Sequence, residues 1–232
     1  MSHKRFDRRL EDIRQALHTM SHDIEELLEQ AFSLVGKTDI GAAVDEIREA
    51  DRAIDAKEVA IEEGAIELLA LHQPMAGDLR VLVTVLKINN DLERVGDHAV
   101  NIAKGAQRLD DLDTLDEHVP IPPELAEMAR LSRQMLSDAL DAFVHENAEE
   151  AAEVRARDDL VDALQDSLFR VMLTHMTGHN ISGCLQVILI GQNLERVADL
   201  ATNIGEDVIY MVQGKTVRHQ GAPDAAKQPG DE

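Results

Sequence analysis

Aromatic residues are nearly missing from this chain. It has no tryptophan, one tyrosine and four phenylalanines, so aromatic side chains make up 2% of the 232 residues. β-Sandwiches and barrels rely on aromatic and β-branched side chains in their strands, and this composition argues against both. Alanine, leucine and glutamate are abundant instead and favour helices. With 44% hydrophobic residues, the chain can bury a substantial core. We therefore expect an all-α protein.

Cysteine and long apolar runs are equally scarce. Cys184 is the single cysteine, which excludes a disulfide framework within the chain. The basic first residues lead into no apolar segment of the kind that a signal peptide needs. The longest apolar stretches, around 81–86 and 185–190, are far shorter than the roughly 20 residues that cross a bilayer. We expect a cytoplasmic protein without direct membrane insertion.

The charge of the chain is strongly one-sided. Asp and Glu total 45 against 23 Lys and Arg, which gives a formal net charge of −22. Such a surface repels the phosphates of nucleic acids and the headgroups of anionic lipids, so we expect no nucleic acid partner. Unaided binding of a free phosphate ion is disfavoured for the same reason. Cations and basic protein surfaces are the partners that this charge attracts.

Apolar residues recur at three- and four-residue spacings along most of the chain, which predicts long amphipathic helices. The acidic stretch 111–123 ends in prolines and is typical of a linker. Six helices are predicted, at about 6–35, 40–71, 76–108, 124–145, 147–176 and 181–212. The predicted units are a first three-helix bundle (1–110), the linker (111–123), a second three-helix bundle (124–213) and a flexible tail (214–232).

The two halves of the chain resemble each other. Residues 90–102 align with 192–204, and eight of these 13 positions are identical, charged positions included. Upstream, the pair Asp51 and Asp55 corresponds to Asp158 and Asp162. A bundle repeat kept only for packing would match at apolar positions alone. The sequence therefore predicts two tandem three-helix bundles related by internal duplication.

Carboxylates follow a helical spacing in both halves. On helix 76–108 the apolar stripe of Leu82 and Leu86 continues through Asn90, Glu93 and Asp97, which predicts oxygen ligands on the core-facing side. Two acidic pairs lie four residues apart and share a helix face. If the second and third helices of each half pack antiparallel, their carboxylates converge. The candidate metal ligands are Asp51, Asp55, Glu93 and Asp97 in the first half and Asp158, Asp162, Glu195 and Asp199 in the second.

Clustered carboxylates need compensation, because neighbouring like charges raise each other's pKa. A metal ion supplies it, and an all-oxygen ligand set favours Mg²⁺, Mn²⁺, Ca²⁺ or iron over a thiolate zinc site. The competing interpretation is a solvated charge face on which Arg94 pairs with Asp97 and Arg196 with Asp199. Because the whole set is duplicated in register, we favour a metal site.

Other kinds of site have little support in the sequence. No Glu-x-x-His pair of the di-iron type is present, and neither a glycine-rich phosphate loop nor a nucleophile elbow occurs. His98 follows Asp97 directly and is expected to point to solvent. We therefore expect no enzymatic activity. A metal-dependent enzyme that uses the carboxylate cluster and a plain helical scaffold remain the alternatives.

The chain resembles the PhoU family over nearly its whole length. The resemblance rests on the paired Glu-Arg-Val-(Gly/Ala)-Asp segments and on residues 73–80, 173–176 and 210–219. The family's motif of an acidic residue four positions before an aspartate coincides with all eight candidate ligands. One departure stands out, since 181–184 read Ile-Ser-Gly-Cys where 79–82 read Leu-Arg-Val-Leu. The two halves need not bind partners equivalently.

The resemblance implies two bundles side by side, often in a homodimer, with multinuclear iron or zinc in some members. It also implies a cytosolic negative regulator of the phosphate-starvation response. Such a regulator links the ATPase subunit of a phosphate ABC transporter to a phosphate sensor histidine kinase and modulates phosphate uptake.

Overall fold

The computed structural model describes residues 2–113, 119–176 and 181–215, and within these ranges the chain forms helices and no strands. The first half contains α1 (Ser2–Ser33), α2 (Gly41–His72) and α3 (Ala76–Asp113), and the second contains α4 (Pro123–Val144), α5 (Ala148–Arg155), α6 (Asp158–His175) and α7 (Ile181–Gln213). The predicted all-α fold of two bundles is confirmed. Much of the predicted linker and nearly all of the predicted tail lie outside the described residues.

Two helix boundaries differ from the prediction. Helix α3 continues to Asp113, into the segment that was predicted to be a linker. The predicted helix 147–176 is broken at Ala156 and Arg157 into α5 and α6. Near the break, Arg155 lies 3.4 Å from Glu206 of α7 and Arg157 lies 2.6 Å from Asp138 of α4. These ion pairs with two different helices favour a turn here, which the apolar periodicity of the sequence does not predict.

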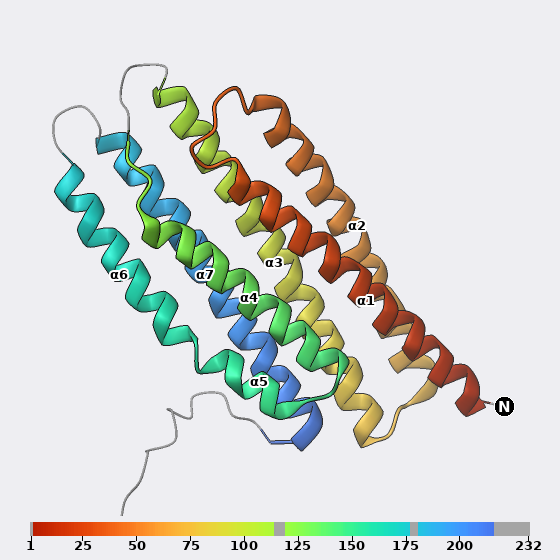
Figure 1. Cartoon of the computed structure of the whole chain (residues 1–232). Coiled ribbons are helices and arrows are strands. Elements are labelled where there is room, and N and C mark those ends of the chain that lie inside the picture. Colours follow the sequence, from red (N-terminus) through yellow and green to blue (C-terminus); the bar gives the residue numbers. More distant parts are fainter. Residues whose placement is uncertain (1, 114–118, 177–180, 216–232) are drawn as a thin grey trace, which may run out of the picture.

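Helices α3 and α7 form the central pair of the molecule, with α1 and α2 on one side and α4, α5 and α6 on the other (Figure 1). The central pair is antiparallel, because early residues of α3 contact late residues of α7. Arg80 donates to the carbonyl of Met211, and at the other end Arg108 donates to Gln186. The connection between α2 and α3 therefore lies at the opposite end from the start of α7.

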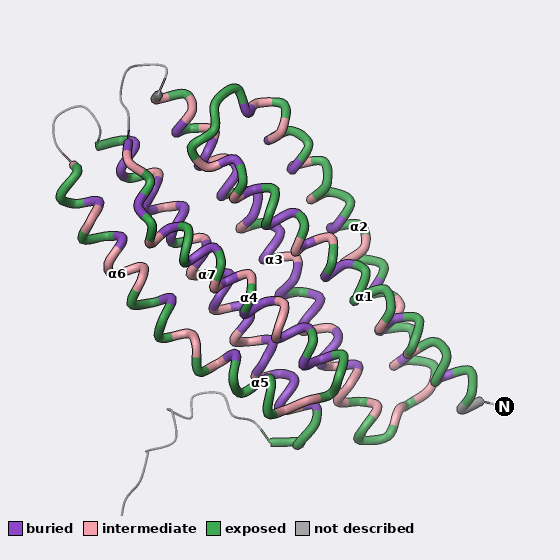
Figure 2. Tube along the Cα trace, in the orientation of Figure 1, coloured by how far each residue is buried: buried purple, intermediate pink, exposed green. Residues whose placement is uncertain are grey.

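Buried residues face the inside of both bundles and continue across the contact between them (Figure 2). The predicted stripe of α1 is confirmed, since Leu17, Met20, Ile24 and Leu28 are fully buried. Equivalent positions of α3 and α7 are buried together, for example Leu92 with Leu194 and Val95 with Val197. The duplicated apolar positions thus supply one continuous core.

Within the described ranges, none of these helices combines the length and the apolar content needed to span a bilayer.

Candidate functional site: two carboxylate clusters

The first carboxylate cluster lies between α2 and α3, at about mid-length of both helices. Asp51 and Asp55 come from α2, and Glu93 and Asp97 come from α3. A Cβ atom at Gly96 would lie 3.0 Å from Oδ1 of Asp51, so this carboxylate rests against the backbone of α3. The absence of a side chain at Gly96 thus allows the two helices to bring their acids together.

Electrostatics confirm that the four acids of the first cluster are neighbours. Burial raises the pKa of Asp51, and the charges of Asp55 and Asp97 raise it further, while Lys104 lowers it. Burial also raises the pKa of Glu93, and Asp97 and Asp55 add to the effect. The neighbouring carboxylates therefore disfavour the ionisation of Asp51 and Glu93, which a bound cation would relieve.

The second carboxylate cluster repeats this arrangement between α6 and α7. Burial raises the pKa of Asp158, with further contributions from Asp199 and Asp162. Burial and the charge of Asp199 likewise raise the pKa of Glu195. The hydroxyl of Thr202 donates to Oδ1 of Asp158 at 3.3 Å. In both halves, then, acids of the two helices lie within electrostatic range of one another.

Positive charge compensates the second cluster better than the first. Arg196 lies 3.5 Å from Glu195 and 3.6 Å from Asp199. Burial raises the pKa of Asp199, whereas Arg196 lowers it, and so do His98 and Arg94 of α3. The expected pair of Arg196 with Asp199 is present. The expected pair of Arg94 with Asp97 is replaced by a contact of 3.3 Å between Arg94 and Asp91.

Two expectations about orientation are wrong. The oxygen stripe of α3 lies at the rim, since Asn90 and Asp97 are exposed and Glu93 is half-buried. Leu92 and Val95 face the core instead, because successive steps of four residues drift around a helix with 3.6 residues per turn. His98 does not point to solvent. Its Nδ1 lies 2.9 Å from Oδ1 of Asn193 on α7, which links the halves between the two clusters.

The donor chemistry of both clusters suits a hard cation, since all eight side chains offer carboxylate oxygens. Among the described residues, no three His, Cys, Asp or Glu side chains are placed so that they could hold a metal ion as they stand. Chelation would therefore require side chains to turn toward the ion. The exposed carboxylates of Asp55, Asp97 and Asp162 lie at the surface, where such a movement disturbs no packing.

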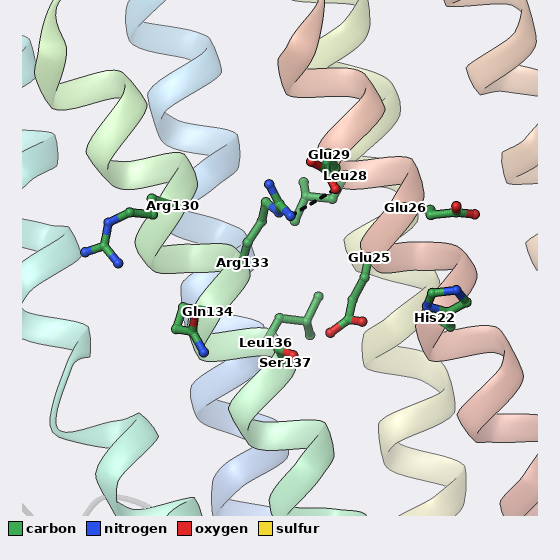
Figure 3. Close-up of a pocket in the computed structure, with 10 residues that line it drawn as sticks. All are labelled: His22, Glu25, Glu26, Leu28, Glu29, Arg130, Arg133, Gln134, Leu136 and Ser137. Atoms are coloured by element: carbon green, nitrogen blue, oxygen red, sulfur yellow. Dashed lines mark hydrogen bonds and ion pairs between the residues drawn. The ribbon is translucent and has the colours of Figure 1, made fainter.

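A separate cavity of about 330 Å³ lies between α1 and α4 (Figure 3). Arg133 of α4 reaches Glu29 of α1 at 3.1 Å across it, and the carboxylate of Glu25 points toward Ser137. Opposite charges thus line the contact between the halves. Cys184 is buried, and burial raises the pKa of its thiol, so it lacks the exposed thiolate that covalent catalysis needs.

Sequence reasoning missed two polar residues beside the first cluster. Glu58 lies one turn beyond Asp55 on α2, and its pKa is raised by burial and by the charges of Glu62 and Asp55. Asn89, and not its neighbour Asn90, is the buried asparagine of α3. Asn89 lies four residues before Glu93, which was a usable signal, but it falls just outside the aligned repeat, which begins at Asn90.

An antiparallel duplication of a three-helix bundle, with one carboxylate cluster in each half, defines the class of this protein. The chain belongs to the PhoU family: the family model for the PhoU domain matches residues 17–106 and 125–208, one match in each half.

Relatives and solved structures agree with this assignment. The chain is 36% identical over 94% of its length to a phosphate-specific transport system accessory protein PhoU homolog of Clostridium acetobutylicum, of which it covers 98%. It is 32% identical over 96% of its length to the accessory protein PhoU of Escherichia coli, of which it covers 91%. The crystal structure of PhoU from Pseudomonas aeruginosa superposes with a TM-score of 0.84 at 33% identity, over 90% of this chain and all of that one. The phosphate transport system regulatory protein PhoU from Streptococcus pneumoniae gives a TM-score of 0.83 at 30% identity, over 91% and 99% of the two chains.

Proposed function

We propose that this chain is a cytoplasmic accessory protein of a phosphate transport system and a negative regulator of the phosphate-starvation response. It links the ATPase subunit of a phosphate ABC transporter to a sensor histidine kinase and restrains phosphate uptake when phosphate is plentiful. The observation that carries this proposal is similarity over nearly full length to proteins named as accessory to phosphate-specific transport. No catalytic role is part of the proposal.

Protein contacts are the route by which such a chain reaches a membrane complex. A net charge of −22 favours basic surfaces on its partners and speeds their association at low salt. The outer helices α2 and α6 lie on opposite sides of the molecule (Figure 1) and give it two separate acidic faces. We propose that the two faces serve different partners and that the chain forms a homodimer, which sedimentation measurements would test.

Metal binding is the second part of the proposal. The two carboxylate clusters bind divalent or multinuclear metal, with Mg²⁺, Mn²⁺, iron or zinc as candidates. Support comes from the all-oxygen donor set, from the raised pKa values of acids in both clusters and from the duplication of the set. A cation bound there would neutralise acids that now repel one another.

Deletion of the gene tests the regulatory role. A strain without the protein should keep phosphate-starvation genes active in phosphate-rich medium and should take up phosphate with little restraint. A deletion strain that represses these genes normally in high phosphate, with no second copy of the gene, contradicts the proposal.

Charge reversal tests the surfaces. Glu46→Lys with Glu63→Lys changes exposed positions of α2, and Asp159→Lys with Asp166→Lys changes exposed positions of α6. If the faces serve different partners, each double variant should lose capture of one partner, either the transporter ATPase or the cytosolic part of the kinase. Adding salt should weaken capture of the same two partners by the wild type. Equal capture by all three proteins would exclude both faces.

A further inference from the structure

The two carboxylate clusters occupy equivalent places in the halves, and the buried positions fix the correspondence. Ile54 and Ile61 of α2 match Val161 and Leu168 of α6, and all four are buried. By the same register, Glu58 corresponds to Gln165 and Glu62 to Phe169. On the other helix of each pair, Asn89 corresponds to Gly191. The first half thus carries three polar or charged side chains at these positions. The second half has the neutral amide of Gln165, the aromatic ring of Phe169 and a glycine, Gly191.

Asn89 is a buried polar side chain with an unused acceptor. It is 1% exposed, and its Nδ2 donates to the main-chain oxygen of Glu58 at 2.9 Å and approaches Oε1 of Glu58 at 3.4 Å. Only the nitrogen of the amide can donate to a carbonyl oxygen, so the bond fixes which atom is Oδ1. Oδ1 has no hydrogen-bond partner. A buried acceptor without a partner costs free energy and requires an explanation.

The surroundings of Asn89 are acidic. Glu58 stands against its amide, and Glu93 follows it by four residues on the same face of α3. Glu58 and Asp55 both contribute to the raised pKa of Glu93, which places the three carboxylates in one electrostatic neighbourhood. A cation would use carboxylate oxygens and Oδ1 together, because an amide carbonyl is an ordinary ligand of Mg²⁺-like and Ca²⁺-like ions.

The second half shares one of these features and lacks the others. Oε1 of Gln165 is likewise buried without a hydrogen-bond partner. A Cβ at Gly191 would lie 2.6 Å from Oε1 of Gln165 and 2.4 Å from Leu168, so the Gln165 amide fills the space that Asn89 takes in the first half. A neutral amide replaces the carboxylate of Glu58. The second cluster also has Arg196 within 3.6 Å of its acids, whereas Lys104 is the one cation that lowers the pKa of Asp51.

We propose that the first half holds an additional divalent-cation subsite, built from Glu58, Asn89 and Glu93, which the second half does not have. The subsite extends the proposed metal binding, on which it rests. The chain should accordingly bind unequal numbers of cations in its halves, with more in the first. Nδ2 of Asn89 keeps its bond to the main chain of Glu58 while Oδ1 turns to the ion.

The test counts Mn²⁺ bound to the full chain, by electron paramagnetic resonance of the free ion during titration. Glu58→Gln gives the first half the residue type of the second, and Asn89→Leu removes Oδ1 at similar volume. Each should lower the number of Mn²⁺ bound by one per chain or weaken one site at least about tenfold. Glu63→Gln, an exposed neighbour of equal charge change, should bind like the wild type.

The outcomes separate this inference from the metal binding on which it rests. If Glu58→Gln and Asn89→Leu bind Mn²⁺ like the wild type while Glu93→Gln with Asp97→Asn loses it, the subsite does not exist but the cluster does. If the wild type binds no Mn²⁺, both proposals fail. Thermal melts followed by circular dichroism show whether Asn89→Leu is folded. If it is not, Mn²⁺ binding by Glu58→Gln, which hardly changes the side-chain volume, still tests the subsite.

Discussion

The ammonium group of Lys87 on α3 lies 2.8 Å from Oδ1 of Asp207 on α7, and the Asp207 side chain is only 3% exposed. Lys87 also lies over the ring of Tyr210, 5.5 Å from its centroid. The hydroxyl of Thr84 donates to the main-chain oxygen of Asp207 in the same region. A buried carboxylate on one half is thus neutralised by a lysine from the other, which makes the docking of the halves depend on charge as well as on apolar packing.

Lys87→Met should therefore destabilise the chain by about 1–3 kcal/mol, because it leaves the buried carboxylate of Asp207 without its lysine. Urea denaturation followed by circular dichroism measures the free energy of unfolding. Lys37→Met removes an exposed lysine in the connection before α2 and should change it by less than about 0.5 kcal/mol. Equal effects of the two substitutions would mean that the pair contributes nothing.

The sequence predicted the helices and the duplication because both depend on local periodicity. Matching residues of the two repeats, such as Leu92 and Leu194, do occupy equivalent buried positions. The break between α5 and α6 was not predictable in this way, since it accompanies the ion pairs of Arg155 and Arg157 with other helices. Contacts between elements far apart in the sequence leave no periodic signal.

The sequence indicated which acids form the candidate site, but not which residues surround them. The spacing of Asp51 and Asp55 indicated two carboxylates on one face, and the charges of both act on Glu93. The bond of His98 to Asn193 was missed because it depends on how α3 and α7 dock. Asn89 was missed because single-residue shifts around a helix decide whether a side chain faces the core or the rim.

Gly205→Ala should destabilise the chain although alanine is the better helix former. A Cβ at Gly205 would lie 2.9 Å from the main-chain oxygen of Ala151, and backbone cannot move aside as a flexible side chain can. We expect a loss of about 1–3 kcal/mol from overpacking of α5 against α7. Gly77→Ala, in the first turn of α3, meets nothing within 4 Å and should stabilise by up to about 1 kcal/mol. Thermal denaturation of both variants measures whether each substitution stabilises or destabilises the chain. A stabilised Gly205→Ala would contradict the close approach of α7 to the main chain of α5.

The metal-free chain should become more stable on mild acidification. Burial and like charges raise the pKa of Glu93 and Glu195, which are ordinarily near 4.5, and of Asp51 and Asp158, ordinarily near 3.8. Such a group binds more protons in the folded chain than in the unfolded one, so stability increases as the pH falls through the raised values and levels off below the ordinary ones. Glu127, whose pKa is lowered by its hydrogen bond to Arg130, works in the opposite direction.

The melting temperature in a chelating buffer should accordingly rise as the pH is lowered from neutral toward the ordinary pKa values of these acids, 4.5 for Glu and 3.8 for Asp. With saturating Mn²⁺ the trend should reverse, because the ligands must be deprotonated to bind the ion. At neutral pH and a hundred times the Kd, bound Mn²⁺ should add about 2.7 kcal/mol for each site. A melting temperature that responds neither to Mn²⁺ nor to pH over this range would identify both clusters as solvated faces.

The two clusters should lose metal separately. Glu93→Gln with Asp97→Asn removes two carboxylates from the first cluster, and Glu195→Gln with Asp199→Asn removes their counterparts from the second. The acids that raise the pKa of Glu93 all come from α2 and α3, whereas those that act on Glu195 come from α6 and α7. Each double variant should therefore keep the metal of the other half.

Metal analysis of chelator-treated protein after reloading with Mn²⁺ gives the number of ions per chain. The variant of the first cluster should lose more ions than the variant of the second, if Glu58 and Asn89 bind an ion of their own. Loss of all metal from either double variant would mean that the clusters act as one site, and this coupling would have to pass through His98 and Arg94, which lower the pKa of Asp199 from the other half. His98→Gln with Arg94→Gln would then weaken this coupling, because it removes both side chains of α3 that act on Asp199.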